Sequence, residues 1–280
     1  MKNKVLTIFT YVLLLIGMGI LNYPGISSLY NRLHEGQVIR AQDEAVKNAS
    51  AQELEDALLA ARAYNEKLGV MGGGIIDAFS GEISEADSEY ESLLNINDNG
   101  VMGYIEIENI NVHLPIAHGI SEKVLQRMAG HIQGSSLPVG GIGTHSVISA
   151  HRGLPSAMLF SDLDQMKEKD IFLIHVLGET LAYEVNQVKT VLPAEVSDVQ
   201  IEAGEDYVTL LTCTPYGINS HRLLVRGTRI PYEPEARDVT QSIIQSIWGW
   251  LLQQKILLIS LSITLIFIVV MIIRAIRKKR

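Results

Sequence analysis

The stretch Thr209-Leu-Leu-Thr-Cys-Thr-Pro-Tyr-Gly-Ile-Asn-Ser-His-Arg-Leu-Leu-Val-Arg-Gly227 places a turn signal between two apolar runs and contains the chain's only cysteine, Cys213. The apolar residues before the cysteine and after the turn predict two strands joined by a loop that starts at Thr214-Pro215. Cys213 then ends a strand beside a loop, where a substrate can reach a nucleophile. Free cysteines are more often buried small hydrophobes, so this thiol needs partners before it indicates chemistry.

Short apolar runs bounded by turn residues continue on both sides of this stretch and predict the fold class. Only two short helices are expected among them, at Ser121–Met128 and Ser161–Met166. Because closing a sheet removes its exposed edges, many short strands in one domain favour a closed, mainly β barrel over residues 103–232. The expected strands are Tyr104–Ile107, Val112–Pro115, Ser146–Ala150, Ile171–Val176, Leu181–Val188, Tyr207–Thr212 and Leu223–Arg229.

The residues before the barrel divide into a helical segment and a polar segment. Residues 24–70 are polar with apolar residues at helical spacing, which predicts one or two amphipathic helices. Residues 71–102 begin with a glycine run and continue with a region, residues 83–99, that is rich in Glu, Asp, Ser and Asn. We expect this second segment to be a mobile linker with little to bury.

Two uncharged apolar stretches, residues 5–23 and 256–273, are each long enough to cross a bilayer. The first is long for a cleaved signal peptide and no clear cleavage site follows it, so we expect an uncleaved anchor. Residues 1–4 contain lysines and residues 274–280 are rich in arginine and lysine, which predicts that both termini are cytoplasmic. The chain between the anchors is then extracytoplasmic, and residues 233–255 form its juxtamembrane segment.

The chain between the two anchors is strongly acidic. All 31 acidic residues lie there, whereas several of the 23 basic residues lie in or beside the anchors. Such a charge argues against a nucleic-acid partner and is typical of a solvated extracellular surface.

A cysteine nucleophile needs a proton partner and a donor for the oxyanion. His151 lies at the end of the apolar run Ser146–Ala150, and Arg222 and Arg226 share one face of the strand after Cys213 by period-two alternation. Histidine is the usual proton partner, although a histidine taken by itself is more often structural. The residues alone therefore make these side chains candidates for a cysteine site.

The candidate residues lie in two long blocks of sequence that resemble those of a known family. The segments AGHIQGSSLPVGGIGTHSVISAHRGLP (Ala129–Pro155) and TLLTCTPYGINSHRLLVRG (Thr209–Gly227) resemble the signature blocks of sortases, in particular the class C, pilus-assembling sortases of Gram-positive bacteria. The likeness extends from about Gly103 to Pro231, and an anchor at each end also resembles class C members. It implies a sortase-type catalytic barrel and an enzyme of the cell membrane.

The resemblance implies a role for each candidate residue. Cys213 would be the nucleophile, His151 the acid/base partner and Arg222 the arginine that orients substrate and stabilises the oxyanion. Thr212 matches the family's threonine before the nucleophile and would position the substrate or the strand. Arg226 is expected to be structural or to donate a hydrogen bond to a residue that itself contacts the substrate.

The resemblance also implies the reaction. A class C sortase cleaves a Leu-Pro-x-Thr-Gly (LPxTG) type of sorting signal after Thr, forms a thioacyl intermediate and passes it to a lysine amine of another pilin subunit. The partners would then be pilin subunits and the membrane. No cofactor is expected, and no residue cluster stands out as a metal site.

The segment Asp77-Ala78-Phe79 resembles the lid of class C sortases, whose usual form is Asp-Pro-aromatic. By that pattern Asp77 would pair with the catalytic arginine and Phe79 would cover the thiol. Ala78 stands where proline is typical, so we expect a lid that opens more readily. The alternative is a flexible linker with an incidental aromatic residue.

Other functions fit parts of the sequence. A housekeeping-type sortase would attach surface proteins to the cell wall, and a membrane-anchored serine peptidase would use a serine such as Ser146 or Ser149 with a lysine. A papain-like site would employ Asn219, although that residue lies in a turn signal. A non-enzymatic binding or sensor domain would leave Cys213 and the basic strand without a purpose.

Overall fold

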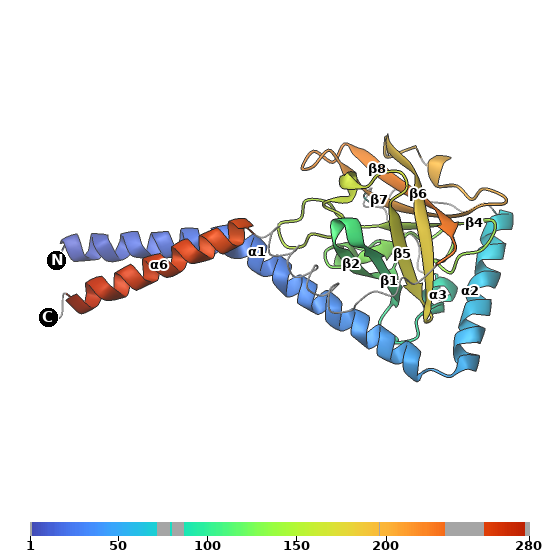
Figure 1. The fold of residues 1–280 in the computed structure, drawn as a ribbon, viewed down its shortest axis with the longest axis horizontal. Helices are drawn as coiled ribbons and strands as arrows, with labels where there is room; N and C mark the ends of the chain where they lie inside the picture. Colours follow the sequence, from blue (N-terminus) through green and yellow to red (C-terminus); the bar gives the residue numbers. More distant parts are fainter. Residues whose placement is uncertain (1, 72–78, 80–86, 196, 233–254, 278–280) are drawn as a thin grey trace. The chain divides into compact units, whose positions relative to one another are not determined.

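The computed structural model describes residues 2–71, 79, 87–195, 197–232 and 255–277 of the 280-residue chain (Figure 1). It forms two compact units, one of residues 1–30 with 236–280 and one of residues 31–235. The second unit contains the expected barrel.

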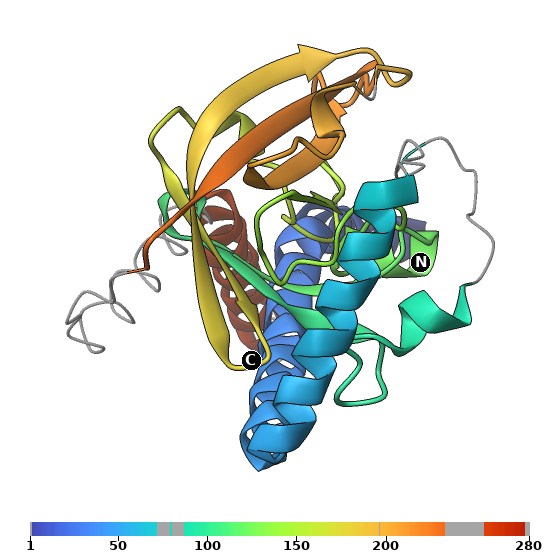
Figure 2. The ribbon, with the colours of Figure 1, turned by 90° about the vertical axis from the view of Figure 1, so that its right-hand side faces the viewer.

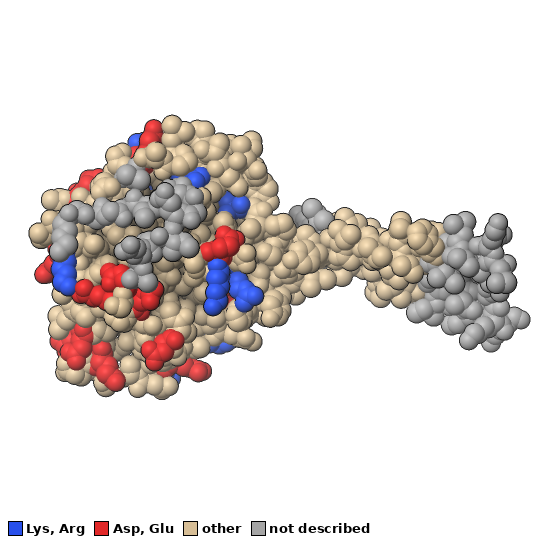
Figure 3. All heavy atoms as spheres, turned by 180° about the vertical axis from the view of Figure 1, so that it is seen from behind, with Lys and Arg blue, Asp and Glu red and all other residues tan. Residues whose placement is uncertain are grey.

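The first unit consists of the start of helix α1 (Lys2–Asn48) and helix α6 (Lys255–Arg277). The part of α1 from Phe9 onward is long and apolar enough to cross a membrane, and the anchor predicted at residues 5–23 falls within α1. The described helical surface in Figure 3 is almost free of charged side chains. In α6 the described apolar stretch, Leu261–Val270, is shorter than a span, so the second anchor stays a prediction.

The second unit contains a closed barrel with the strand order β1-β2-β3-β4-β7-β8-β6-β5, which confirms the predicted fold class (Figures 1 and 2). The pairs β2–β3 and β4–β7 are parallel, and the other neighbours are antiparallel. The strands are β1 (Val101–Ile107), β2 (Val112–His118), β3 (Ala129–His131), β4 (Thr144–Ser149), β5 (Ile171–Val176), β6 (Glu179–Val191), β7 (Asp206–Thr214) and β8 (His221–Ile230).

All the strands expected from the sequence are present, and β3 is the strand that the sequence did not predict. Its three residues, Ala129–His131, are too few to show an alternating pattern. Gly130 is required there, because a Cβ atom would lie 2.3 Å from the carbonyl oxygen of Gly119. The two expected helices are shorter than predicted: α4 spans Glu122–Leu125, and the second is the 3-10 turn Leu163–Gln165. Further 3-10 turns span Glu108–Ile110 and Ser197–Val199.

The helical segment before the barrel forms the end of α1 and helix α2 (Ala51–Met71). A capping box separates them, since Ser50 Oγ accepts from Glu53 N at 3.2 Å and Glu53 Oε2 accepts from Ser50 N at 2.7 Å. Helix α2 is held against the barrel by Asn65, whose side chain donates to the carbonyl of Leu137 and accepts from its backbone N–H. In Figure 2, α2 lies alongside the barrel.

The expectation of a mobile linker with little to bury is wrong for the end of the segment 71–102. Helix α3 (Ser88–Ser92) is capped by Asp87, and Tyr90 and Leu94 are almost fully buried. The Tyr90 hydroxyl lies 2.9 Å from Nδ1 of His131 and 3.1 Å from its carbonyl oxygen. One tyrosine and one leucine in a polar segment are therefore enough to fix it to the barrel. Asp77 and Ala78 lie outside the described residues.

Candidate active site

Cys213 lies in β7 and is only 5% exposed. On one side β7 pairs with β8, where Arg222 is the direct cross-strand partner of Cys213. On the other side β7 pairs with β4 in parallel, with Ser149 opposite Leu211. Continuing this register past the end of β4 puts His151 opposite Cys213. The barrel thus places Cys213 and Arg222 on neighbouring strands and His151 just beyond the end of a third.

Two side-chain hydrogen bonds lock the register around Cys213. The buried Thr212 hydroxyl donates to the carbonyl oxygen of Ala150 at 2.7 Å, and Nη1 of Arg152 donates to the Thr214 hydroxyl at 3.2 Å. These bonds join the residues on either side of Cys213 to the residues on either side of His151. Of the two roles expected for Thr212, the structure gives it a bond that positions the strand.

Arg152 is a site residue that the sequence analysis missed. Its Nε donates to the carbonyl oxygen of Ser161 at 3.1 Å, and its guanidinium also forms an ion pair with Asp164. Arg152 therefore fixes the loop that follows His151. The only signal in the sequence is the position of this arginine directly after a candidate catalytic histidine.

The turn that precedes β8 holds the guanidinium of Arg222 in place. Its side chain is 6% exposed, and Nη1 donates to the carbonyl oxygens of Asn219 and His221, each at 3.1 Å. Asn219 has a φ of 59° and its N–H donates to the carbonyl oxygen of Pro215, so it serves the turn through its backbone. This agrees with the turn interpretation of Asn219.

Phe79 contacts two of the three expected catalytic residues. Its ring centroid lies 5.2 Å from that of His151, and Cζ of Arg222 lies 5.2 Å from the same ring. The ring also packs against the apolar cluster Ile132, Val147, Val191, Val199, Leu211 and Leu224. One aromatic side chain therefore bridges the histidine and the arginine that flank Cys213.

His151 faces a carboxylate that sequence reasoning did not identify. Nε2 of His151 lies 3.6 Å from Oε2 of Glu122, at the start of α4. That separation is too long for a hydrogen bond, and Nε2 is buried without a hydrogen-bond partner in the described part of the chain. One ring nitrogen of His151 therefore lies near the carboxylate of Glu122 without a hydrogen bond to any described residue. No sequence signal linked Glu122 to a histidine so far along the chain.

Arg226 takes part in a separate cluster further along β8. Its Nε donates to Oδ1 of Asn186 at 3.1 Å, its Nη1 to Oε1 of Glu202 at 3.3 Å, and its Cζ lies 4.3 Å from the ring of Tyr207. Its cross-strand partner is Thr209, four residues before Cys213. The contacts of Arg226 that the structure describes are those of a residue that holds the barrel wall together.

Two further histidines are buried in structural hydrogen bonds. His145 donates from Nδ1 to the carbonyl oxygen of Gln200 and accepts at Nε2 from the Thr209 hydroxyl, both at 2.7 Å. Burial lowers the pKa of His145 to about 4, and burial lowers the pKa of His131 to about 4 as well. Both rings are therefore neutral at pH 7 and unsuited to proton transfer there.

The serine alternative receives little support from the geometry. The hydroxyls of Ser146 and Ser149 are buried and have no hydrogen-bond partner among the described residues, so neither faces a base that could activate it. Within the same residues, no group of three His, Cys, Asp or Glu side chains is placed to hold a metal ion.

Comparison with known proteins gives one consistent family. The sequence model of the sortase domain matches residues 105–230. A crystal structure of Streptococcus pneumoniae sortase C, reported for its insights into catalysis and pilin substrate specificity, is 49% identical with a TM-score of 0.65 and covers 70% of this chain and 97% of its own. Sortase C1 of Streptococcus agalactiae is 45% identical, with a TM-score of 0.65, over 70% of this chain and 100% of its own.

A more distant relative belongs to another class. Sortase A of Bacillus anthracis is 27% identical over 146 residues, which are 52% of this chain and 68% of that protein. The identity is thus much higher to the sortase C structures, which are matched over nearly their whole length. The chain therefore belongs to the sortase family of transpeptidases, and within it to class C.

Proposed function

We propose that this enzyme polymerises pilin subunits. It would cleave an LPxTG-like sorting signal after Thr, hold the new carboxyl end as a thioester on Cys213, and transfer it to a lysine amine of another pilin. The observation that carries this proposal is the register of three strands, which supports a nucleophile at Cys213 with His151 on one side and Arg222 on the other.

The first half-reaction follows from these positions. The Cys213 thiolate attacks the Thr carbonyl carbon, forms the C–S bond and pushes the carbonyl electrons onto oxygen. Arg222, a permanently charged fork of donors, is proposed to stabilise that oxyanion. When the oxyanion collapses, the C–N bond breaks, and protonated His151 gives its proton to the departing amine.

The second half-reaction reverses the roles. The lysine amine attacks the thioester carbon, His151 accepts the amine proton, and the C–S bond breaks to restore the Cys213 thiolate. The product is an isopeptide bond, and each proton that His151 gives in the first half is recovered in the second. Glu122, 3.6 Å from Nε2 of His151, is placed to orient the imidazole.

Phe79 is proposed to act as the lid of the free enzyme. A ring that touches both His151 and Arg222 occupies the space that a substrate carbonyl needs between them. Asp77 would add an ion pair to Arg222, and Ala78 in place of proline would leave the segment easier to open. These contacts support a closed resting state that a sorting signal must displace.

Pilin polymerisation is favoured over attachment of proteins to the cell wall by two observations. The sortase C structures are 42 to 49% identical to this chain, against 27% for sortase A of Bacillus anthracis. The second observation is that Phe79 lies over His151 and Arg222. A covered site suits an enzyme that acts only when a particular subunit displaces the cover. Attachment to the cell wall is the alternative function.

The catalytic barrel is proposed to lie outside the cell between two membrane anchors. The apolar, weakly buried start of α1 supports the first anchor, and the apolar residues of α6 support the second. The basic residues at both ends support cytoplasmic termini. Single cysteines placed at residue 3 and residue 279 of a Cys213→Ala chain would both resist a membrane-impermeant thiol reagent in intact cells if this topology is right.

The decisive experiment incubates the full chain in detergent with a fluorescent LPxTG peptide and weighs the protein by intact mass spectrometry. A peptide-sized adduct is expected in the native chain and in Ser149→Ala, and it should be absent in Cys213→Ala. An adduct that survives Cys213→Ala, or that Ser149→Ala abolishes, would contradict the cysteine mechanism.

A second arm separates the two sortase functions. The thioacyl enzyme is offered a pilin subunit with its lysines intact, the same subunit with its lysines acetylated, or a peptide that imitates the cell-wall amine. Transfer to the intact pilin alone supports polymerisation. Preferential transfer to the wall-like amine would assign the housekeeping function instead.

A further inference from the structure

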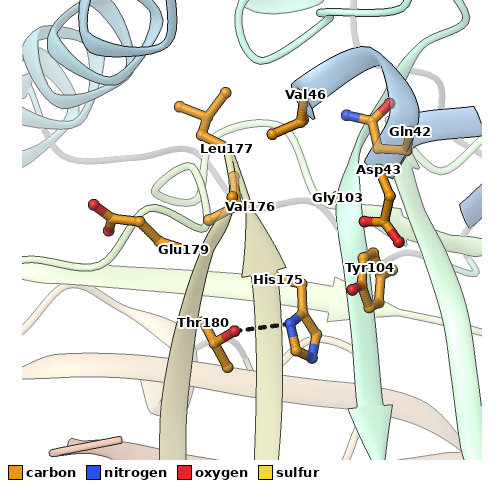
Figure 4. Close-up of a pocket in the computed structure, with 11 residues that line it drawn as sticks. Gln42, Asp43, Val46, Gly103, Tyr104, His175, Val176, Leu177, Glu179 and Thr180 are labelled. Carbon is orange, nitrogen blue, oxygen red and sulfur yellow. Dashed lines mark hydrogen bonds between the residues drawn. The ribbon is translucent and has the colours of Figure 1, made fainter. Parts of the chain in front are cut away.

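A cavity of about 150 Å³ lies between α1 and the hairpin that joins β5 to β6 (Figure 4). Strands β1 and β5 form its floor, and in the cyclic strand order they are opposite β7 and β4, which carry Cys213 and lead to His151. The cavity is therefore separate from the proposed active site. Its lining residues are Gln42, Asp43 and Val46 of α1, Gly103 and Tyr104 of β1, and residues 175–180 of the hairpin.

Gln42 is the unexplained residue of this cavity. The residue is 2% exposed, and within the described residues neither Nε2 nor Oε1 has a hydrogen-bond partner. In Figure 4 the amide nitrogen of Gln42 is directed toward Val46, and the amide oxygen points the other way. A buried carboxamide without partners is costly, so an occupant that offers both an acceptor and a donor would be favoured.

The charges around the cavity favour a cationic occupant. Asp43 follows Gln42 on α1, and burial together with the carboxylates of Asp43 and Glu106 raises the pKa of Tyr104 to about 12. Glu179 lies in the lining as well, and none of the lining residues that the structure describes is a lysine or an arginine. The Thr180 hydroxyl lies 3.0 Å from Nδ1 of His175, and Oε2 of Glu106 lies 3.4 Å from its Nε2.

The pocket is partly open to solvent, so its volume sets the size of the group that it encloses while the rest of a ligand stays outside. A cavity of about 150 Å³ has room for one benzene molecule, which has six heavy atoms. An α-ammonium, its Cα and the peptide group that follows amount to five heavy atoms. They also combine one positive charge, which complements the Asp43 carboxylate, with a carbonyl acceptor and an N–H donor for the Gln42 carboxamide. The Tyr104 hydroxyl already forms a hydrogen bond with Asp43.

We propose that this cavity binds the free amino terminus of a polypeptide, with the α-ammonium directed to Asp43 and the first peptide group hydrogen-bonded to the carboxamide of Gln42. The tight hairpin turn favours a small first residue, because Val46 and Leu177 border the remaining space. This site does not depend on the transpeptidase reaction. It would give the enzyme a means of holding a partner at a distance from Cys213.

The test measures binding of small probes to the full Cys213→Ala chain in detergent at pH 6.5, by saturation-transfer NMR and calorimetry. Removing the thiol prevents any amine probe from being acylated, so the result is independent of the proposed catalysis. Glycinamide is expected to bind at least about tenfold tighter than propionamide, in which a methyl group replaces the ammonium, and than n-butylamine, which lacks the amide. Equal binding of all three would overturn the proposal.

Variants locate the site. Gln42→Met keeps the side-chain length without its polar atoms, and Asp43→Asn removes the charge; each is expected to weaken glycinamide about tenfold. Glu44→Gln, an exposed charge change on the same helix, is expected to change it less than twofold. If Gln42→Met fails to fold, Asp43→Asn alone decides, and unchanged binding in the folded variants means that the cavity holds only water.

A last arm identifies the source of the amino terminus. Triglycine amide is expected to bind at least as tightly as glycinamide and to lose binding when its amino group is acetylated. Exclusion of triglycine amide while glycinamide still binds would assign the cavity to a small free amine and contradict the polypeptide partner.

Discussion

Cys213 and Arg222 are direct cross-strand partners in the antiparallel pair β7–β8. Partners in such a pair have their side chains on the same face of the sheet, about 4.5–5.5 Å apart at Cβ. The relationship is set by the backbone, so it does not depend on the conformation of either side chain. A guanidinium in this position is well placed to meet charge that develops beside the sulfur.

Replacing Arg222 with lysine is expected to lower kcat for peptide cleavage by about 10²–10³, with a smaller change in KM. Lysine keeps the charge but not the planar fork of donors, and its ammonium cannot hold the carbonyls of Asn219 and His221 in the same way. Steady-state kinetics with an LPxTG peptide measure the change. Arg226→Lys is the matched control on the same strand, and an equal loss there would refute the assignment.

Replacing Thr212 with valine is expected to reduce both stability and activity. Valine keeps the shape but leaves the buried carbonyl of Ala150 without its 2.7 Å hydrogen bond, which costs about 1–3 kcal/mol. The Tm should fall by several degrees, and kcat should fall because His151 is no longer held in register. Thr212→Ser keeps the hydroxyl and should restore both quantities; a serine variant as impaired as the valine one would argue against the hydrogen bond.

Phe79→Ala is expected to speed alkylation of Cys213 by an uncharged thiol reagent about tenfold or more, because the ring contacts both residues that flank the thiol. Asp77→Ala should act in the same direction, and Ala78→Pro should slow the reaction. Phe79→Leu retains apolar packing without the aromatic contacts and should give an intermediate rate. Rates that are identical in all four variants would leave Phe79 without a covering role.

The free energy of unfolding is expected to fall as the pH drops from about 6.5 toward 4. Burial lowers the pKa of His131 and of His145 to about 4, so the unfolded chain takes up protons in this range before the folded chain does. Each ring contributes roughly 2–3 kcal/mol to the effect. Burial raises the pKa of Asp206, which opposes the trend at the lowest pH.

Urea denaturation of the detergent-solubilised chain at pH 7 and pH 4.5, followed by circular dichroism, checks this expectation. His145→Asn removes one titrating ring, so its stability should change less between the two pH values than that of the native chain. A variant with the same pH dependence as the native chain would show that His145 is not responsible.

The sequence predicted the barrel because most of its strands are long enough to show an apolar pattern bounded by turns. The sequence did not predict β3, because Ala129–His131 shows no such pattern. The position of β3 is fixed by the close approach of Gly130 to Gly119. The closing pairs β1–β5 and β4–β7 join strands that are far apart in the chain, and local patterns carry no information about their register.

The proposed site was predictable to the extent that its residues lie in dense local motifs. Cys213, His151 and Arg222 are of this kind. Glu122 meets His151 only because α4 and the end of β4 are brought together by the barrel. Gln42 resembles any polar residue on an amphipathic helix, and its burial results from the hairpin that packs against α1.

The chain that carries Phe79 is fastened to the barrel on both sides, by Asn65 in α2 and by Tyr90 in α3. A ring tethered in this way competes with substrate at a local concentration that dilution of the enzyme cannot change. The activity per enzyme molecule should therefore depend on the concentration of sorting signal and be the same at any enzyme concentration. A concentrated supply of sorting signal would therefore displace the ring more often than a dilute one.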